Sequence, residues 1–97
     1  MSQVEDRVHD VVERVVRERF AGTNVQRVVV SRDRDHDGDE IFRVMVVLDD
    51  KARLKPTTMT SLIRHLRDGL DRIGESAFPI TRVMTKKDFE LLRHGSR

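Results

Sequence analysis

Apolar residues in the first part of the chain recur at roughly helical spacing. They are Val4, Val8, Val11, Val12, Val15 and Phe20. Ser2 and Glu5 form a capping-box pattern that predicts a helix start at Ser2, and Gly22 predicts its end. Because valine is a mediocre helix former, we expect burial of this apolar stripe to stabilise the helix.

Two stretches in the middle of the chain, residues 25–32 and 41–49, are rich in β-branched side chains. Such runs are typical of β-strands. Between them lies Gly38, which accepts a left-handed backbone without steric cost. We therefore predict a β-hairpin closed by the three-residue loop 36–38, a type I turn with a glycine bulge.

The predicted loop fixes which residues of the two strands face each other. Val30 is expected opposite Val44, and Val28 opposite Val46. One face of the hairpin is then Val28, Val30, Phe42, Val44, Val46 and Leu48. The other face is Val29, Ile41, Arg43, Met45, Val47 and Asp49. Its centre is too apolar for water alone, so we expect an interface at Val29, Ile41, Met45 and Val47.

The strongest helical pattern in the chain follows the hairpin. Its apolar positions are Met59, Leu62, Ile63, Leu66, Leu70 and Ile73. Pro56 predicts the start of this helix, and Gly74 predicts its end. Charged residues one turn apart on the remaining side indicate a solvated face.

The last part of the chain predicts one strand and one short helix. Residues 78–84 have the composition of a strand, and Pro79 near its start places that end at a sheet edge. Thr85 and Asp88 form a second capping box, which opens a helix expected to end at Gly95.

These elements predict a single α+β domain, residues 1–97, in the order αββαβα. We expect a three-stranded sheet of antiparallel type. Both main helices should pack on the face that carries Val44, Val46 and Leu48, and the C-terminal helix should be short.

Composition narrows the class of protein. The chain is 37% hydrophobic and 37% charged, which is typical of a globular domain with a heavily solvated exterior. It has no cysteine, so a disulfide and a thiolate zinc site are excluded. No apolar run approaches the ~20 residues that cross a bilayer, and the N-terminus is too acidic for a signal peptide. We expect a cytoplasmic protein with no membrane partner.

The hairpin loop concentrates negative charge. Residues 33–40 hold five acids and one arginine, a net charge of −4, so the rest of the chain carries +6 to give +2 overall. The spacing D-x-D-x-D-G matches the start of an EF-hand calcium loop, but its twelfth position is Val44 where a glutamate is needed. The candidate metal ligands are Asp33, Asp35, Asp37, Asp39 and Glu40. The alternative is a charged hairpin tip that prevents edge pairing and aids solubility.

The sequence contains no P-loop, dinucleotide-binding or H-E-x-x-H motif, and its four histidines are scattered. We therefore expect no enzymatic activity and no cofactor. Nucleic acid is a possible partner, because basic residues flank the second main helix and the last strand. The candidates for phosphate contact are Lys51, Arg53, Lys55, Arg82, Lys86 and Lys87. The absence of Tyr and Trp for base stacking argues against it.

The order αββαβα, with a charged loop between two valine-rich strands, resembles BolA-like proteins and type II KH-like folds. The segment 42–47 is similar to the second strand of BolA-like chains, and Arg64-His65 falls where they have basic helical residues. The family's metal-ligand histidine has no counterpart between Ile80 and Thr85, and there is no G-x-x-G loop. The resemblance therefore implies the fold, and these two departures from the family pattern count against carrying over an iron–sulfur or RNA-binding role.

The chain also resembles short bacterial proteins that pair a D-x-D-x-D-G-D turn with a later G-E-x-x-F-P segment, here residues 74–79. That resemblance implies no activity. The hypothesis that best fits the sequence is a small interaction module, a homodimer or the small subunit of a complex. Its acidic tip and basic helices would orient the partner. The alternative is a domain that binds nucleic acid or responds to a divalent cation.

Overall fold

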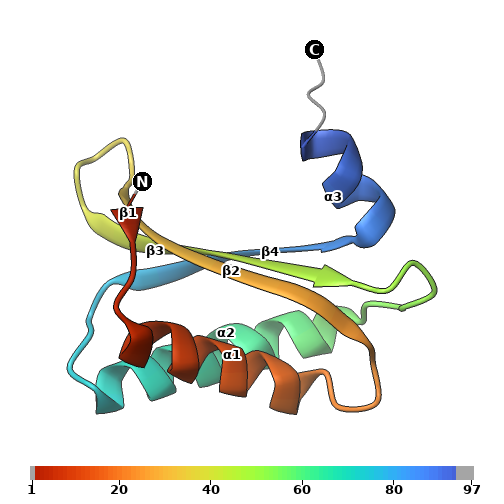
Figure 1. The fold of residues 1–97 in the computed structure, drawn as a ribbon. Helices are drawn as coiled ribbons and strands as arrows, with labels where there is room; N and C mark the ends of the chain where they lie inside the picture. The colour runs from red at the N-terminus through yellow and green to blue at the C-terminus, as the bar shows by residue number, and fades with distance from the viewer. Residues whose placement is uncertain (1, 94–97) are drawn as a thin grey trace.

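The computed structural model describes residues 2–93. Its elements are β1 (Ser2–Gln3), α1 (Asp6–Arg19), β2 (Val25–Arg34), β3 (Glu40–Leu48), α2 (Pro56–Arg72), β4 (Phe78–Thr85) and α3 (Lys86–Arg93). The long helices α1 and α2 lie side by side under one face of the sheet, and α3 stands on the other face (Figure 1). The α+β class and the packing of both main helices on one face are confirmed.

The sheet has the strand order β1-β2-β3-β4. β2 and β3 are antiparallel, whereas β3 and β4 are parallel, so the prediction of an antiparallel sheet was wrong. The physical reason is α2, which carries the chain back along the sheet, so that β4 begins at the same end as β3. β4 therefore forms one edge of a mixed sheet.

The two-residue strand β1 was not predicted. Ser2 and Gln3 pair with Arg32 and Ser31 of β2, so Ser2 belongs to the sheet and not to a helix cap. Glu5 has the extended backbone of an N-cap residue, and α1 begins at Asp6. The predicted helix start at Ser2 was therefore wrong.

The β2–β3 hairpin has the register that its loop predicts. Val30 pairs with Val44, and Val28 pairs with Val46. The Gly38 N–H donates to the Asp35 carbonyl at 3.0 Å, and Gly38 has a φ of +88°, the left-handed value that closes the turn.

The core fills the space between the sheet and the two long helices. Its fully buried side chains include Val8, Val12, Val16, Phe42, Val44, Val46, Leu62, Leu66 and Leu70. α1 and α2 approach closely at Gly69, where an added Cβ would lie 3.0 Å from the Val11 Cγ1. The valine stripe of α1 is thus stabilised by burial, as its low helix propensity requires.

Two side chains cap the start of α3. The Thr85 Oγ1 accepts a hydrogen bond from the Asp88 N–H at 3.2 Å, as the capping-box pattern predicts. The Asp50 Oδ1 accepts from the Lys87 N–H at 2.8 Å and ties the loop after β3 to this helix. The predicted end of the helix, Gly95, lies outside the described residues.

Candidate interaction surface on the open face of the sheet

The face of the sheet opposite α1 and α2, here called the open face, is covered at one end by α3. Val47 and Met84 are neighbours in the β3–β4 register, and both are buried although neither belongs to the core beneath the sheet. The Arg27 guanidinium lies 5.3 Å from the centre of the Phe89 ring, so α3 reaches across to β2. This end of the open face is therefore occupied by the chain itself.

Beyond α3, the open face has an apolar centre with basic residues beside it. Val29, Met45 and Arg82 lie in one row across the three long strands, and Arg43 pairs with Ile80 in the next row. Val29 and Ile80 are exposed and Met45 is half-buried. The remaining open face therefore offers apolar contact area at its centre.

The predicted interface residues separate into two groups. Val29 and Met45 are accessible, as expected. Ile41 is only 3% exposed and Val47 only 1%, so the expectation that they await a partner was wrong. α3 lies over the end that contains Val47, and the Asp33–Arg43 ion pair lies beside Ile41 on the same face.

Apolar residues that were not predicted as interface residues are also exposed on β4 and α3. Ile80 lies on β4, and Leu91 and Leu92 on α3 are 64% and 51% exposed. Leu92 follows Phe89 by three positions, so the two lie on the same side of α3. The spacing of Phe89, Leu91 and Leu92 in a short charged helix is the sequence signal that could have predicted an apolar surface there. We call Val29, Met45, Ile80 and Leu92 the open-face patch.

The acidic loop uses several of its carboxylates within the hairpin. The Asp35 Oδ1 accepts from the Asp37 N–H at 3.0 Å and from the Asp39 N–H at 2.9 Å, which fixes the turn. Asp33 pairs with Arg43 on the neighbouring strand, and this contact lowers the pKa of the Asp33 carboxyl below its usual range. The loop is therefore a well-ordered turn with a charged exterior.

These contacts engage some of the carboxylates that were predicted as metal ligands. Glu40 lies 3.5 Å from Arg34, and Asp37 and Asp39 are exposed. Within residues 2–93, no group of three or more His, Asp or Glu side chains is placed to hold a metal ion. The structure thus does not bring Asp33, Asp35, Asp37, Asp39 and Glu40 together around one point.

The candidate phosphate-binding residues gather toward one end of the molecule. Lys51, Arg53 and Lys55 are exposed in the loop between β3 and α2, and Lys86 and Lys87 begin α3. Arg82 lies on the open face of β4 beside Met45, in the row of the apolar centre. The hydrogen bond from the Lys87 N–H to Asp50 brings the loop and the helix together.

A network of four charged side chains stabilises the other end of the fold. Glu75 accepts hydrogen bonds from Arg7 at 3.0 Å and from Arg32 at 3.1 Å, and Arg32 also bonds Glu5 at 2.8 Å. The hydrogen bond to Arg32 lowers the pKa of Glu5, and both carboxylates raise the pKa of Arg32. Because Arg7 also donates to the Ile73 carbonyl at 2.7 Å, the network fixes the end of α2.

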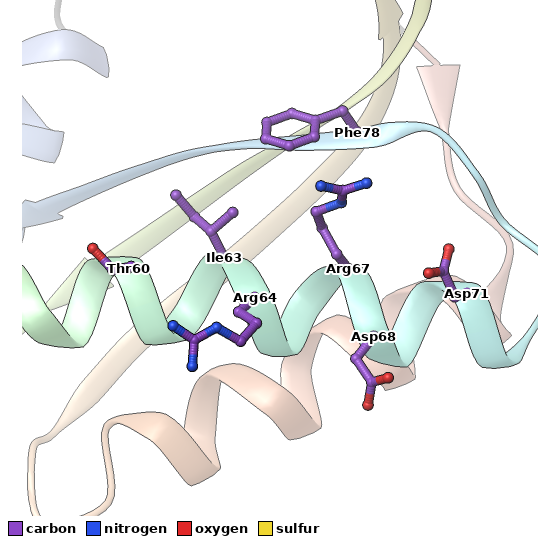
Figure 2. A pocket seen from close by; sticks show the side chains of 7 residues that line it. All are labelled: Thr60, Ile63, Arg64, Arg67, Asp68, Asp71 and Phe78. Carbon is purple, nitrogen blue, oxygen red and sulfur yellow. The ribbon is translucent and has the colours of Figure 1, made fainter.

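A shallow groove of about 560 Å³ runs between α2 and the edge strand β4 (Figure 2). Its lining residues are Thr60, Ile63, Arg64, Arg67, Asp68, Asp71 and Phe78. The Arg67 guanidinium lies 5.3 Å from the centre of the Phe78 ring. The groove is open to solvent, and its lining presents charged groups over a small apolar floor without a paired nucleophile and base.

Ser61 and His65 lie one helical turn apart on α2. They are the residue types of a nucleophile and its general base, but their geometry does not suit that role. The His65 Nδ1 lies 2.8 Å from the Ser61 carbonyl oxygen and 3.4 Å from the Ser61 Oγ. The shorter contact requires a proton on Nδ1, so this nitrogen has no lone pair to accept the serine proton. His65 therefore has a local structural role in α2.

Comparison of the chain with protein-family models, with curated proteins and with solved structures found no match. Across residues 2–93, none of the helices has the length and apolar character needed to cross a membrane.

Proposed function

We propose that this protein is a non-catalytic interaction module that binds a protein partner through the open face and α3. The partner is a second copy of the chain or the larger subunit of a complex. One observation carries the proposal: α3 exposes Leu91 and Leu92 beside a sheet face on which Val29 and Ile80 are also exposed. Exposed apolar residues gathered on one side of a molecule are typical of protein-binding sites.

The chemistry of the groove between α2 and β4 supports a binding role over a catalytic one. The groove between α2 and β4 is open to water, and its lining lacks the enclosed acid and base that catalysis requires. The acidic tip is held by its own hydrogen bonds, with Asp35 turned into the loop. These groups shape and charge the surface around the open face.

The proposal is tested by placing a photo-crosslinking amino acid at Leu92 or at Ile80 and irradiating the cells that express the protein. We expect discrete adducts on a gel from both positions, because both lie in the open-face patch. The matched control carries the same amino acid at Arg14, an exposed residue of α1, the helix that lies under the opposite face of the sheet. Adducts from position 14 with none from positions 80 and 92 would contradict the proposal.

Nucleic acid is a second candidate partner, favoured by one observation. The Asp50–Lys87 hydrogen bond holds the basic loop 51–55 beside the start of α3. Phosphate binding there predicts an affinity for DNA or RNA that falls steeply with salt and that is lost on changing Lys86 and Lys87 to Gln. Fluorescence anisotropy with labelled oligonucleotides measures it. Equal, weak binding by wild type and variant would argue against this partner.

A further inference from the structure

This inference rests on the proposed function and concerns the identity of the partner. The open face carries opposite charge at its two ends. The hairpin tip, residues 33–40, has a net charge of −4 and curls toward the side of the sheet on which α3 stands (Figure 1). Arg27 and α3 lie toward the other end, and Arg82 lies nearer the centre, in the row of Val29 and Met45. Together they carry five basic and two acidic residues, a net charge of +3. We call this group the basic end.

The sheet residues of the open-face patch lie between the hairpin tip and α3, with Arg82 beside Met45 on the edge strand. Val29, Met45 and Ile80 occupy the middle rows of the sheet, and Leu92 projects from α3 at the basic end. A partner that covers the patch must therefore present positive charge at one end and negative charge at the other. Its centre must be apolar.

A second copy of this chain meets all of these requirements. A two-fold axis that lies between two open faces, perpendicular to the strands, reverses one molecule relative to the other. The tip of each copy then lies against the basic end of its partner, so the interface contains two such contacts. The two patches meet at the centre. An interface of this isologous type closes at two subunits.

We propose that the chain forms a homodimer in which the open faces pack together in antiparallel orientation, each hairpin tip against the partner's basic end. A stable interface buries about 800 Å² on each partner, roughly an eighth of the 6594 Å² surface of this chain. The apolar patch forms the centre of this interface, the surrounding charged residues supply the rest of its area, and the charged ends fix the orientation.

The same charge pattern disfavours a nucleic acid along the open face. A strand whose phosphates contact Arg27 and Arg82 would continue toward the five carboxylates of the tip. Like charges placed against each other weaken association, so phosphate contacts would be restricted to the basic end. Only a partner with a reversed charge pattern fits the whole face.

The test reverses the charge of each end separately. In one variant Asp37, Asp39 and Glu40 become Lys, which changes the tip from −4 to +2. In the other, Arg82, Lys86 and Lys87 become Glu, which changes the basic end from +3 to −3. All six side chains are exposed, and Asp35, which holds the turn, is retained. Circular dichroism checks that both variants fold.

Sedimentation velocity at low salt measures the dimerisation constant. Wild type should dimerise, and each reversed variant alone should dimerise at least about tenfold more weakly, because its two tip contacts become repulsive. An equimolar mixture of the two variants should form a heterodimer, since both contacts are then attractive. The control changes Asp10, Glu18 and Asp68 of the helical face to Lys, the same change in charge, and should dimerise like wild type.

Three results would overturn the antiparallel homodimer with paired charged ends. Wild type could remain a monomer at high micromolar concentration, both reversed variants could dimerise like wild type, or their mixture could fail to pair. In each case, adducts from positions 80 and 92 at masses other than twice 11.3 kDa would retain the interaction module with a different protein partner. A monomer that also gives no adduct from these positions would overturn the proposed function as well.

Discussion

Arg32 and Glu75 are 43 positions apart in the chain, and the Arg32 Nη2 lies 3.1 Å from the Glu75 Oε2. The Glu75 side chain is only 13% exposed, and the same oxygen accepts a hydrogen bond from Arg7. The Arg32 guanidinium also lies 4.9 Å from the centre of the Phe42 ring. One carboxylate thus joins α1, β2 and the loop before β4.

Changing Glu75 to Gln should destabilise the fold by about 1–2 kcal/mol, because two guanidinium groups lose a charged acceptor in a partly buried site. Urea unfolding followed by circular dichroism measures the change. The matched control is Glu13→Gln, which removes an exposed pair with Arg17 on α1 and should change stability by less than about 0.5 kcal/mol. Equal effects of the two substitutions would contradict the role assigned to Glu75.

The pKa of Glu5 is lowered chiefly by its hydrogen bond to Arg32, so this carboxylate favours folding when it is ionised. Its contribution is complete above the usual pKa of 4.5 and is lost as the pH falls through the lower pKa of the folded state. Glu5→Gln should therefore be less stable than wild type at neutral pH, and the difference should vanish in acid. Chemical denaturation at several pH values measures it. A difference that grows toward low pH would contradict this assignment.

Much of the fold could be predicted because the signals are local. The loop 36–38 determines the hairpin register, so Val30 and Val44 were placed opposite each other from the sequence. The start of α2 at Pro56 and the cap of α3 at Thr85 likewise depend on residues a few positions apart.

Other features depend on groups far apart in the chain. The residues of β4 do not determine whether it runs parallel or antiparallel to β3. That direction depends on how α2 crosses the sheet. The burial of Val47 depends on where α3 folds back, and the partners of Glu75 lie 68 and 43 positions away. Of the four predicted interface residues, Val29 and Met45 are therefore accessible, whereas Ile41 and Val47 are buried by the chain itself.

The backbone conformation of Gly38 gives a test of the hairpin turn. Its φ is +88°, and nothing lies within 4 Å of the position that a Cβ would occupy. Gly38→Ala should therefore destabilise the fold by about 1–2 kcal/mol through backbone strain alone. Gly38→Asn should be milder, since asparagine tolerates this conformation better. Thermal unfolding of both variants measures the difference, and an alanine variant as stable as wild type would argue against the left-handed turn.

Calcium should not stabilise the acidic loop specifically. Asp33 is paired with Arg43 and Asp35 binds the loop backbone, so these carboxylates do not converge on one ion. A titration with calcium chloride, followed by thermal unfolding, should match a titration with magnesium chloride at equal ionic strength. A rise in Tm with calcium only, reflecting a stabilisation free energy that grows as RT ln(1 + [L]/Kd), would show a site that this loop conformation lacks.

The contact between Gly69 of α2 and Val11 of α1 gives the sharpest test of the core. An alanine at position 69 would place its Cβ 3.0 Å from the Val11 Cγ1, closer than side chains normally pack. Overpacking of this kind costs about 1–3 kcal/mol, whereas replacing a helical glycine with alanine gains about 1 kcal/mol. Gly69→Ala should therefore be neutral to destabilising in the wild-type chain.

In a Val11→Ala background the same substitution should be stabilising, because the colliding methyl group is gone and the helix gain remains. A double-mutant cycle by urea unfolding should give a coupling of about 1 kcal/mol or more between the two positions. Val15, whose Cγ2 would lie at 3.5 Å, serves as the control: Val15→Ala should change the effect of Gly69→Ala much less. Additive effects of Val11→Ala and Gly69→Ala would mean that the two helices do not approach at this point.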